Sequence, residues 1–155
     1  MAKFKSFSKL GQIGDKKKNK TTYTKQPATA KVTSSSAHMV NDLEVDSELD
    51  LFLLLYKNGT KKSYLSGKKI MSPESRGMSL FVGQFAHVLA KGKNKYPYFK
   101  MYSENIIQLT NEEHLLLDNG TEDQRKKYGL ENNCDWSKVY ELRDKLKEEY
   151  DNLIK

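Results

Sequence analysis

The scarcity of apolar side chains in residues 1–41 is the feature that most constrains how this chain can fold. The segment carries a run of three lysines and many serines and threonines, but few aliphatic residues. Such a composition buries too little apolar surface to offset the entropy lost on ordering. We therefore predict that residues 1–41 are a flexible, disordered basic arm, and that residues 42–155 form one folded domain around a single core.

Charge is distributed in blocks along the chain, whose net charge is +7. Residues 1–32 contain nine lysines against one aspartate, and residues 57–100 contain ten basic residues against one glutamate. Residues 33–56 and 101–155 are acidic in balance. A basic surface attracts the phosphates of nucleic acids through the release of counterions. The pattern favours a nucleic-acid partner, and a merely solvated lysine-rich surface is the alternative.

Three further observations exclude whole classes of protein. The longest apolar run, residues 51–56, is far shorter than the roughly 18 residues that span a bilayer. The lysine-containing N-terminus lacks the apolar segment of a secretory signal. The lone cysteine, Cys134, can form neither an internal disulfide nor a paired-cysteine zinc knuckle. We expect a cytoplasmic protein with no membrane association.

Periodicity and turn residues predict an α+β fold built from short elements. The first expected element is a helix from residue 42 or 47 to residue 57, followed by a tight hairpin or knuckle at 63–70 and a loop at 72–78. A strand at 80–89, which could bend at Gly83, comes next. A basic loop at 91–95 then leads to a second strand at 105–109. Capping boxes at Thr110 and Thr121 predict two helices, over 110–117 and 121–129. An amphipathic helix with Asp135 as its N-cap follows, and we assign that helix to packing.

Three polar residues fall where these elements would meet. His87 lies near the end of the first strand, His114 lies one turn into the helix after the second strand, and Asn105 lies between them. Asp118 follows His114 by four residues and shares its helix face, so an imidazole and a carboxylate could bind one metal ion. The order of strand, loop, strand and helix predicts that His87, Asn105 and His114 border one cleft.

Three segments, QFAHVLAKG at 84–92, YP at 96–97 and ENIIQLTNEEH at 104–114, together with Asp118, resemble the HNH nucleases. This is the ββα-metal or His-Me finger family, and the chain looks most like the small HNH proteins of bacteriophage genomes. The resemblance covers about residues 49–120. It implies a ββα-metal core with flanking helices, and a phage-encoded protein that acts in the bacterial host cell.

The resemblance implies a role for each matching position. His87 matches the general base that takes a proton from the attacking water, and Asn105 matches the asparagine whose backbone hydrogen bonds fix the loop and orient that base. His114 matches a ligand of one divalent metal ion (Mg²⁺, Mn²⁺ or Zn²⁺), and Asp118 stands where some relatives carry a further ligand. These roles agree with the chemistry of a neutral imidazole and a Lewis acid. The side chains expected to contact flanking DNA phosphates are Lys91, Lys93 and Lys95.

The chain departs from the family pattern at Ala86, where many members carry an Asp or His metal ligand. Three consequences are open: the metal is held by His114, Asp118, water and phosphate, or Gln84 or Glu113 contributes, or activity is weakened. The turn at 66–69 occupies the place of the cysteine-containing knuckle of many relatives. The side chains expected to pack there instead are Tyr64, Leu65 and Ile70.

Three functions are compatible with these residues. The first is a metal-dependent HNH endonuclease that hydrolyses DNA phosphodiester bonds, acting as a monomer or homodimer. The second is a catalytically degenerate HNH-fold protein that binds DNA, which Ala86 and the lysine-rich arm would favour. The third, which we rank last, is a scaffold that binds a protein partner through the acidic C-terminal helix.

Overall fold

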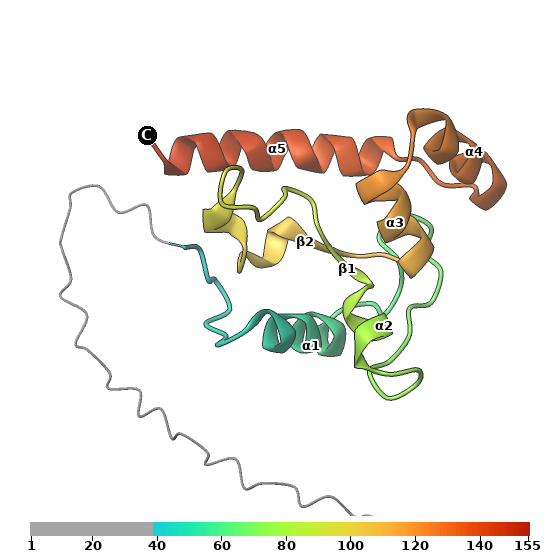
Figure 1. Ribbon diagram of the computed structural model, residues 1–155, viewed down its shortest axis with the longest axis horizontal. Coiled ribbons are helices and arrows are strands. Elements are labelled where there is room, and N and C mark those ends of the chain that lie inside the picture. The colour runs from blue at the N-terminus through green and yellow to red at the C-terminus, as the bar shows by residue number, and fades with distance from the viewer. Residues whose placement is uncertain (1–38) are drawn as a thin grey trace, which may run out of the picture. The chain divides into compact units, whose positions relative to one another are not determined.

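The computed structural model describes residues 39–155, so the basic block at 1–32 and most of the predicted arm lie outside the described residues. The described elements are α1 (Glu48–Asn58), α2 (Met78–Val82), β1 (Phe85–His87), the 3₁₀ helices η1 (Pro97–Phe99) and η2 (Ser103–Asn105), β2 (Ile106–Gln108), α3 (Asn111–Asn119), α4 (Glu122–Asn132) and α5 (Ser137–Leu153) (Figure 1). Of the described part of the arm, Val40 already belongs to the folded unit, because its amide donates to the Tyr98 carbonyl over 2.8 Å.

The two strands pair antiparallel, with Phe85 opposite Gln108, Ala86 opposite Ile107 and His87 opposite Ile106. Helix α3 begins three residues after β2 ends, so strand, strand and helix follow one another along the chain. Helices and a small two-stranded sheet make this an α+β fold, which confirms the predicted class.

The sheet separates two apolar clusters, because successive side chains of a strand point to opposite faces. Phe85 and Ile106 pack in one cluster with buried side chains of α1 and α2. Ala86 and Ile107 pack in the other, with buried side chains of α3 and α5 such as Leu117. Figure 1 shows α1 and α5 on opposite sides of the strand pair. His87 therefore lies at the end of a strand that has an apolar cluster packed on each face.

The prediction of one strand over 80–89 is wrong in its first half. Residues 78–82 form α2, and the chain then turns through Gly83 and Gln84 before β1. The apolar run hides the break because Phe81 and Phe85 are buried alike, one from a helix and the other from a strand. The bend expected at Gly83 is confirmed. A Cβ there would come within 2.5 Å of Asn111 Oδ1, so a larger residue would force the Asn111 side chain to move.

Most other predicted elements are confirmed by their local hydrogen bonds. Ser47 caps α1 by accepting from the Asp50 amide, and both predicted capping boxes are formed, at Thr110 and Thr121. Helix α5 starts at Ser137 rather than at the residue after Asp135. The Asp135 carboxylate still accepts from the Ser137 amide over 2.9 Å, so it caps the helix from one residue further away.

The knuckle at 63–70 forms a narrow turn that closes with a bridge between Lys62 and Lys69. Leu65 and Ile70 are buried as expected, but Tyr64 is 43% exposed and does not pack there. Ser63 donates through its hydroxyl to the fully buried carboxylate of Glu113. The buried acid of α3 thus connects the knuckle to the helix.

Glu113 also accepts from the Thr110 amide and from the Tyr128 hydroxyl, each over 2.9 Å. Burial acts to raise the pKa of this carboxyl, yet the hydrogen bonds from Ser63, Ser66, Thr110 and Tyr128 hold it below its usual value. A carboxyl whose pKa is lower in the folded state stabilises the fold above its unfolded pKa, and this contribution disappears as the pH falls through the folded pKa.

We therefore expect Glu113→Gln to lower the free energy of unfolding at pH 7 by about 1–3 kcal/mol, because an amide replaces a charged acceptor of several hydrogen bonds. The difference from the wild type should shrink as the pH falls below about 4.5. Urea unfolding at pH 7 and pH 3.5 measures both effects. The neighbouring exposed residue provides the control, Glu112→Gln, and equal losses in the two variants would contradict the role of the buried carboxylate.

Candidate active site

A buried asparagine fixes the loop that follows β1. Asn105 is fully buried, and its Oδ1 accepts from the Leu89 amide over 2.7 Å. Its Nδ2 donates to the carbonyls of Leu89 and Phe99, over 3.1 and 3.0 Å. One side chain thus joins the two ends of the segment 89–99 and uses all of its strong hydrogen-bonding directions but one. Asn105 does not face solvent, so any contribution to chemistry is made through the loop.

His87 lies at the end of β1 with its side chain only 10% exposed. Its Nε2 lies 3.0 Å from the carbonyl oxygen of Lys100 and 3.5 Å from Oε1 of Glu48. Both neighbours accept hydrogen bonds, so Nε2 carries the proton in the neutral ring. Nδ1 then keeps its lone pair, and it is the ring atom able to accept a proton.

Burial lowers the pKa of the His87 imidazole below its usual value, and the charges of Lys91 and His114 act in the same direction. The Lys100 carbonyl and the Glu48 carboxylate favour the protonated ring without reversing the shift. At neutral pH His87 is therefore a neutral imidazole with one free lone pair. A general base requires this state.

Glu48, the first residue of α1, was not identified from the sequence. Its carboxylate contacts the Lys91 ammonium and lies 3.3 Å from Lys100 Nζ. Burial acts to raise the pKa of Glu48, but the two lysines hold it below its usual value. Lys91, which we expected to contact DNA, is paired here with an acid of its own chain. The contact joins residues far apart in sequence, and no local sequence pattern predicts it.

His114 and Asp118 form a pair on the exposed side of α3. His114 Nδ1 lies 2.7 Å from the carbonyl oxygen of Gly83, so Nδ1 carries the proton and donates it. Nε2 lies 3.2 Å from Oδ2 of Asp118. Nε2 thus faces a carboxylate oxygen, and a cation between the two atoms would stabilise this arrangement.

The donor set of this pair fits a divalent metal ion. Ligands at metal distances of about 2.0–2.2 Å commonly lie roughly 3 Å apart, and ligating histidines usually donate their other ring N–H to a carbonyl or carboxylate. Within residues 39–155, no cluster of three or more His, Cys, Asp or Glu side chains is arranged to hold a metal. His114 and Asp118 would therefore hold an ion as two protein ligands.

The alternative ligands considered for the position of Ala86 are occupied elsewhere. Ala86 is fully buried and packs in the cluster beside α5. Gln84 Oε1 accepts from the Met71 amide over 2.6 Å, and its Nε2 donates to the Met71 carbonyl over 3.0 Å. The Glu113 carboxylate accepts hydrogen bonds from the knuckle, the cap and α4. Both side chains are thus already engaged in other hydrogen bonds, which disfavours them as further ligands.

A cavity of about 340 Å³ opens beside His87. Its walls come from the end of β1, the following loop, α3 and α5. The charged and imidazole side chains that line it are His87, Lys95, Asp118, Arg143 and Lys147. The structure thus brings the predicted base, one predicted metal ligand and one predicted DNA contact to a single cavity. The prediction that Asn105 and His114 border the same cleft as His87 is not borne out for this cavity, because neither residue lines it.

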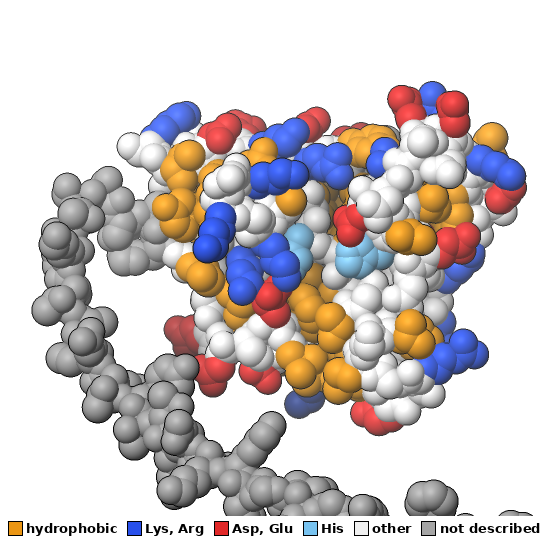
Figure 2. All heavy atoms as spheres, viewed as in Figure 1, with side chains coloured by type: hydrophobic (Ala, Val, Ile, Leu, Met, Phe, Trp, Pro, Cys, Tyr) orange, Lys and Arg blue, Asp and Glu red, His pale blue; other side chains and the backbone are white. Residues whose placement is uncertain are grey.

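Figure 2 shows the two described histidines on one face, with lysine and arginine side chains gathered beside them. Of the three lysines predicted to contact DNA, only Lys95 lines the cavity, whereas Lys93 is exposed in the loop. Arg143 and Lys147 were missed, because we assigned their helix to packing. Their i, i+4 spacing on the polar side of an amphipathic helix was a signal that could have identified them.

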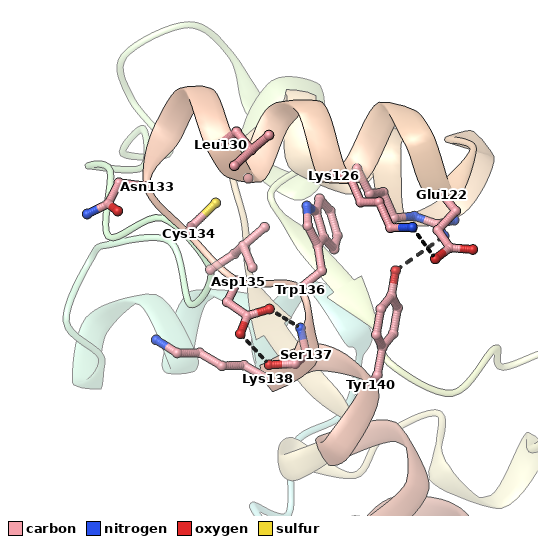
Figure 3. A pocket seen from close by; sticks show the side chains of 13 residues that line it. Glu122, Lys126, Leu130, Asn133, Cys134, Asp135, Trp136, Ser137, Lys138 and Tyr140 are labelled. Carbon is pink, nitrogen blue, oxygen red and sulfur yellow. Dashed lines mark hydrogen bonds and ion pairs between the residues drawn. The ribbon is translucent and has the colours of Figure 1, made fainter.

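A larger cavity, of about 790 Å³, lies between α4 and α5 and contains none of the predicted site residues. Figure 3 shows that many of its polar side chains are paired with one another. Lys126 lies 2.9 Å from Glu122, and Ser137 donates to Asp135 over 2.7 Å. Three cations and two carboxylates line this cavity, so its excess of positive charge is smaller than that of the cavity beside His87.

No family model, curated protein or solved structure matches the chain. The fold and the site define an α+β protein whose half-exposed His–Asp pair and nearly buried neutral histidine lie on one face. Among residues 39–155, no helix combines the length and the apolar character needed to cross a membrane. The function must be inferred from the chemistry of the site.

Proposed function

We propose that this protein is a metal-dependent endonuclease with an HNH, or ββα-metal, core that hydrolyses phosphodiester bonds in DNA. The observation that carries the proposal is the geometry of the two histidines. One imidazole has its Nε2 proton directed to acceptors and a free Nδ1, and the other has its Nδ1 proton directed to a carbonyl and a free Nε2 beside a carboxylate. A base and a ligand for a cation are the two functions that such a hydrolysis requires.

In the proposed reaction His87 Nδ1 accepts the proton of the attacking water. The Lys100 carbonyl fixes the tautomer, and Asn105 positions that carbonyl by holding the adjacent Phe99. His114 and Asp118 would hold one divalent ion. Such an ion, when bound, neutralises the charge that develops on the leaving 3′ oxygen. Lys95 supplies positive charge at the cavity beside the base.

The test is metal-dependent conversion of supercoiled plasmid. We expect relaxed circles with Mg²⁺ or Mn²⁺ and none with EDTA. His114→Ala and Asp118→Asn should each lower the rate by about 10–100-fold or more, because each removes one of two protein ligands. Asp123→Asn removes the same charge from an exposed position on α4 and should leave the rate unchanged. Cleavage that persists in EDTA, or that survives loss of both ligands, would contradict the proposal.

A second function, DNA binding without cleavage, is favoured by one observation. The two-residue ligand set is small, and the position before His87 is a core alanine. Under this alternative the plasmid is retarded on a gel but is not cut with any divalent ion, and His87→Gln changes nothing measurable.

A further inference from the structure

We propose that the cavity beside His87 binds a backbone phosphate of the DNA strand, and that Arg143 and Lys147 of α5 are cations of this binding site. This inference rests on the proposed function and adds the helix that we had assigned to packing alone. The cavity has Lys95 from the loop and Asp118 from α3 on its other walls. Three cationic side chains therefore face one carboxylate around a space next to the base.

The cations of this cavity have little competition from acids of their own chain. Neither Lys95 nor Arg143 forms an ion pair with any residue in the described range. Lys147 has only Asp144 near it, at 3.7 Å on the exposed surface, and such a pair contributes little. Arg143 lies over the Tyr140 ring at 5.8 Å, which leaves its N–H groups available.

This arrangement differs from that of the other lysines on the same face. Lys91 and Lys100 share the single carboxylate of Glu48, so part of their positive charge is already compensated before any ligand arrives. The cavity itself presents an excess of positive charge, because Lys95, Arg143 and Lys147 line it together with one carboxylate, that of Asp118. The guanidinium of Arg143 can donate two parallel hydrogen bonds to phosphate oxygens, and Lys147, one turn further along the helix, adds a point charge. The volume of about 340 Å³ lies at the lower end of the range for ligand sites, as suits a small group on a longer polymer.

The experiment measures binding of a fluorescein-labelled 20-base-pair DNA duplex by anisotropy, in EDTA and at several NaCl concentrations. We expect the double variant Arg143→Ala/Lys147→Ala to bind about tenfold more weakly at low salt, and its slope of log affinity against log salt to fall by about 1–2. The double variant Lys138→Ala/Lys145→Ala removes the same charge from other faces of α5, and it should bind within about twofold of wild type. Exchange of the two cations, Arg143→Lys/Lys147→Arg, should retain most of the affinity.

Equal losses in the two alanine variants would overturn the proposal, because they would indicate diffuse attraction to the whole basic surface. No loss in the first variant would overturn it as well. Both variants alter exposed or half-exposed helix positions, so matching thermal unfolding curves confirm that the comparison is between folded proteins. Because binding is measured in EDTA, the phosphate site can be supported even if the protein does not cleave DNA. Cleavage unaffected by Arg143→Ala/Lys147→Ala would show that the nuclease does not use this site.

Discussion

Replacement of His87 by glutamine is expected to lower the single-turnover rate of plasmid cleavage by about 10²–10⁴-fold, the usual contribution of a general base. The glutamine amide can still donate to the Lys100 carbonyl, so the loop keeps its partner while the basic lone pair of Nδ1 is lost. DNA affinity should stay within about twofold of the wild type, because the neutral His87 ring adds no positive charge. The measurement is single-turnover cleavage with saturating protein, beside anisotropy in EDTA.

The pH dependence gives an independent check on the same residue. His87 acts as a base only when neutral, and burial holds the pKa of its imidazole below the usual value. The rate constant kcat/KM should therefore rise with pH, reach half its plateau below about pH 6.5 and stay flat through neutrality. A midpoint clearly above pH 7 would mean that the limiting group is not the His87 described here. A variant at His87 that cuts as fast as the wild type would remove this residue from the mechanism altogether.

The parts of the fold that could be predicted are those whose causes are local in sequence. The capping boxes at Thr110 and Thr121 depend on hydrogen bonds within three residues. The His114–Asp118 pair depends on one helical turn. Both features follow from helix geometry alone, which is why their spacing was informative. The break of the strand at Gly83 was only half predicted, because burial of Phe81 does not distinguish a helix from a strand.

The parts that could not be predicted depend on contacts between distant segments. Glu48 reaches Lys91 and Lys100 only because α1 packs under the first strand. Arg143 reaches the cavity of His87 only because α5 lies across the other face of the sheet. A periodic pattern shows which face of a helix is polar, but it does not show what lies opposite that face. The charged surroundings of His87 therefore could not be predicted from the sequence, although His87 itself could be identified as a candidate base.

Asn105 combines a feature that the sequence predicted with contacts between distant segments that only the structure shows. The resemblance to the HNH family assigns it to fixing a loop, and the structure shows three hydrogen bonds to the backbone of residues 89 and 99. The next residue along the chain, Lys100, supplies the carbonyl that faces His87 Nε2. The same loop carries Lys95 to the wall of the cavity. A change at Asn105 should therefore alter stability, the orientation of the base and the cation of the loop together.

We expect Asn105→Asp to lower the free energy of unfolding by about 3–4 kcal/mol, because a carboxylate directed at the Leu89 and Phe99 carbonyls replaces an amide that donates to both. The melting temperature should fall by roughly 15 °C. Asn94→Asp makes the same chemical change at an exposed position of the same loop and should shift the melting temperature by no more than about 2 °C. Thermal unfolding followed by circular dichroism measures both variants. If Asn105→Asp had the same melting temperature as Asn94→Asp, other contacts would have to hold the loop. Asn105 would then not be the residue that positions the proposed base.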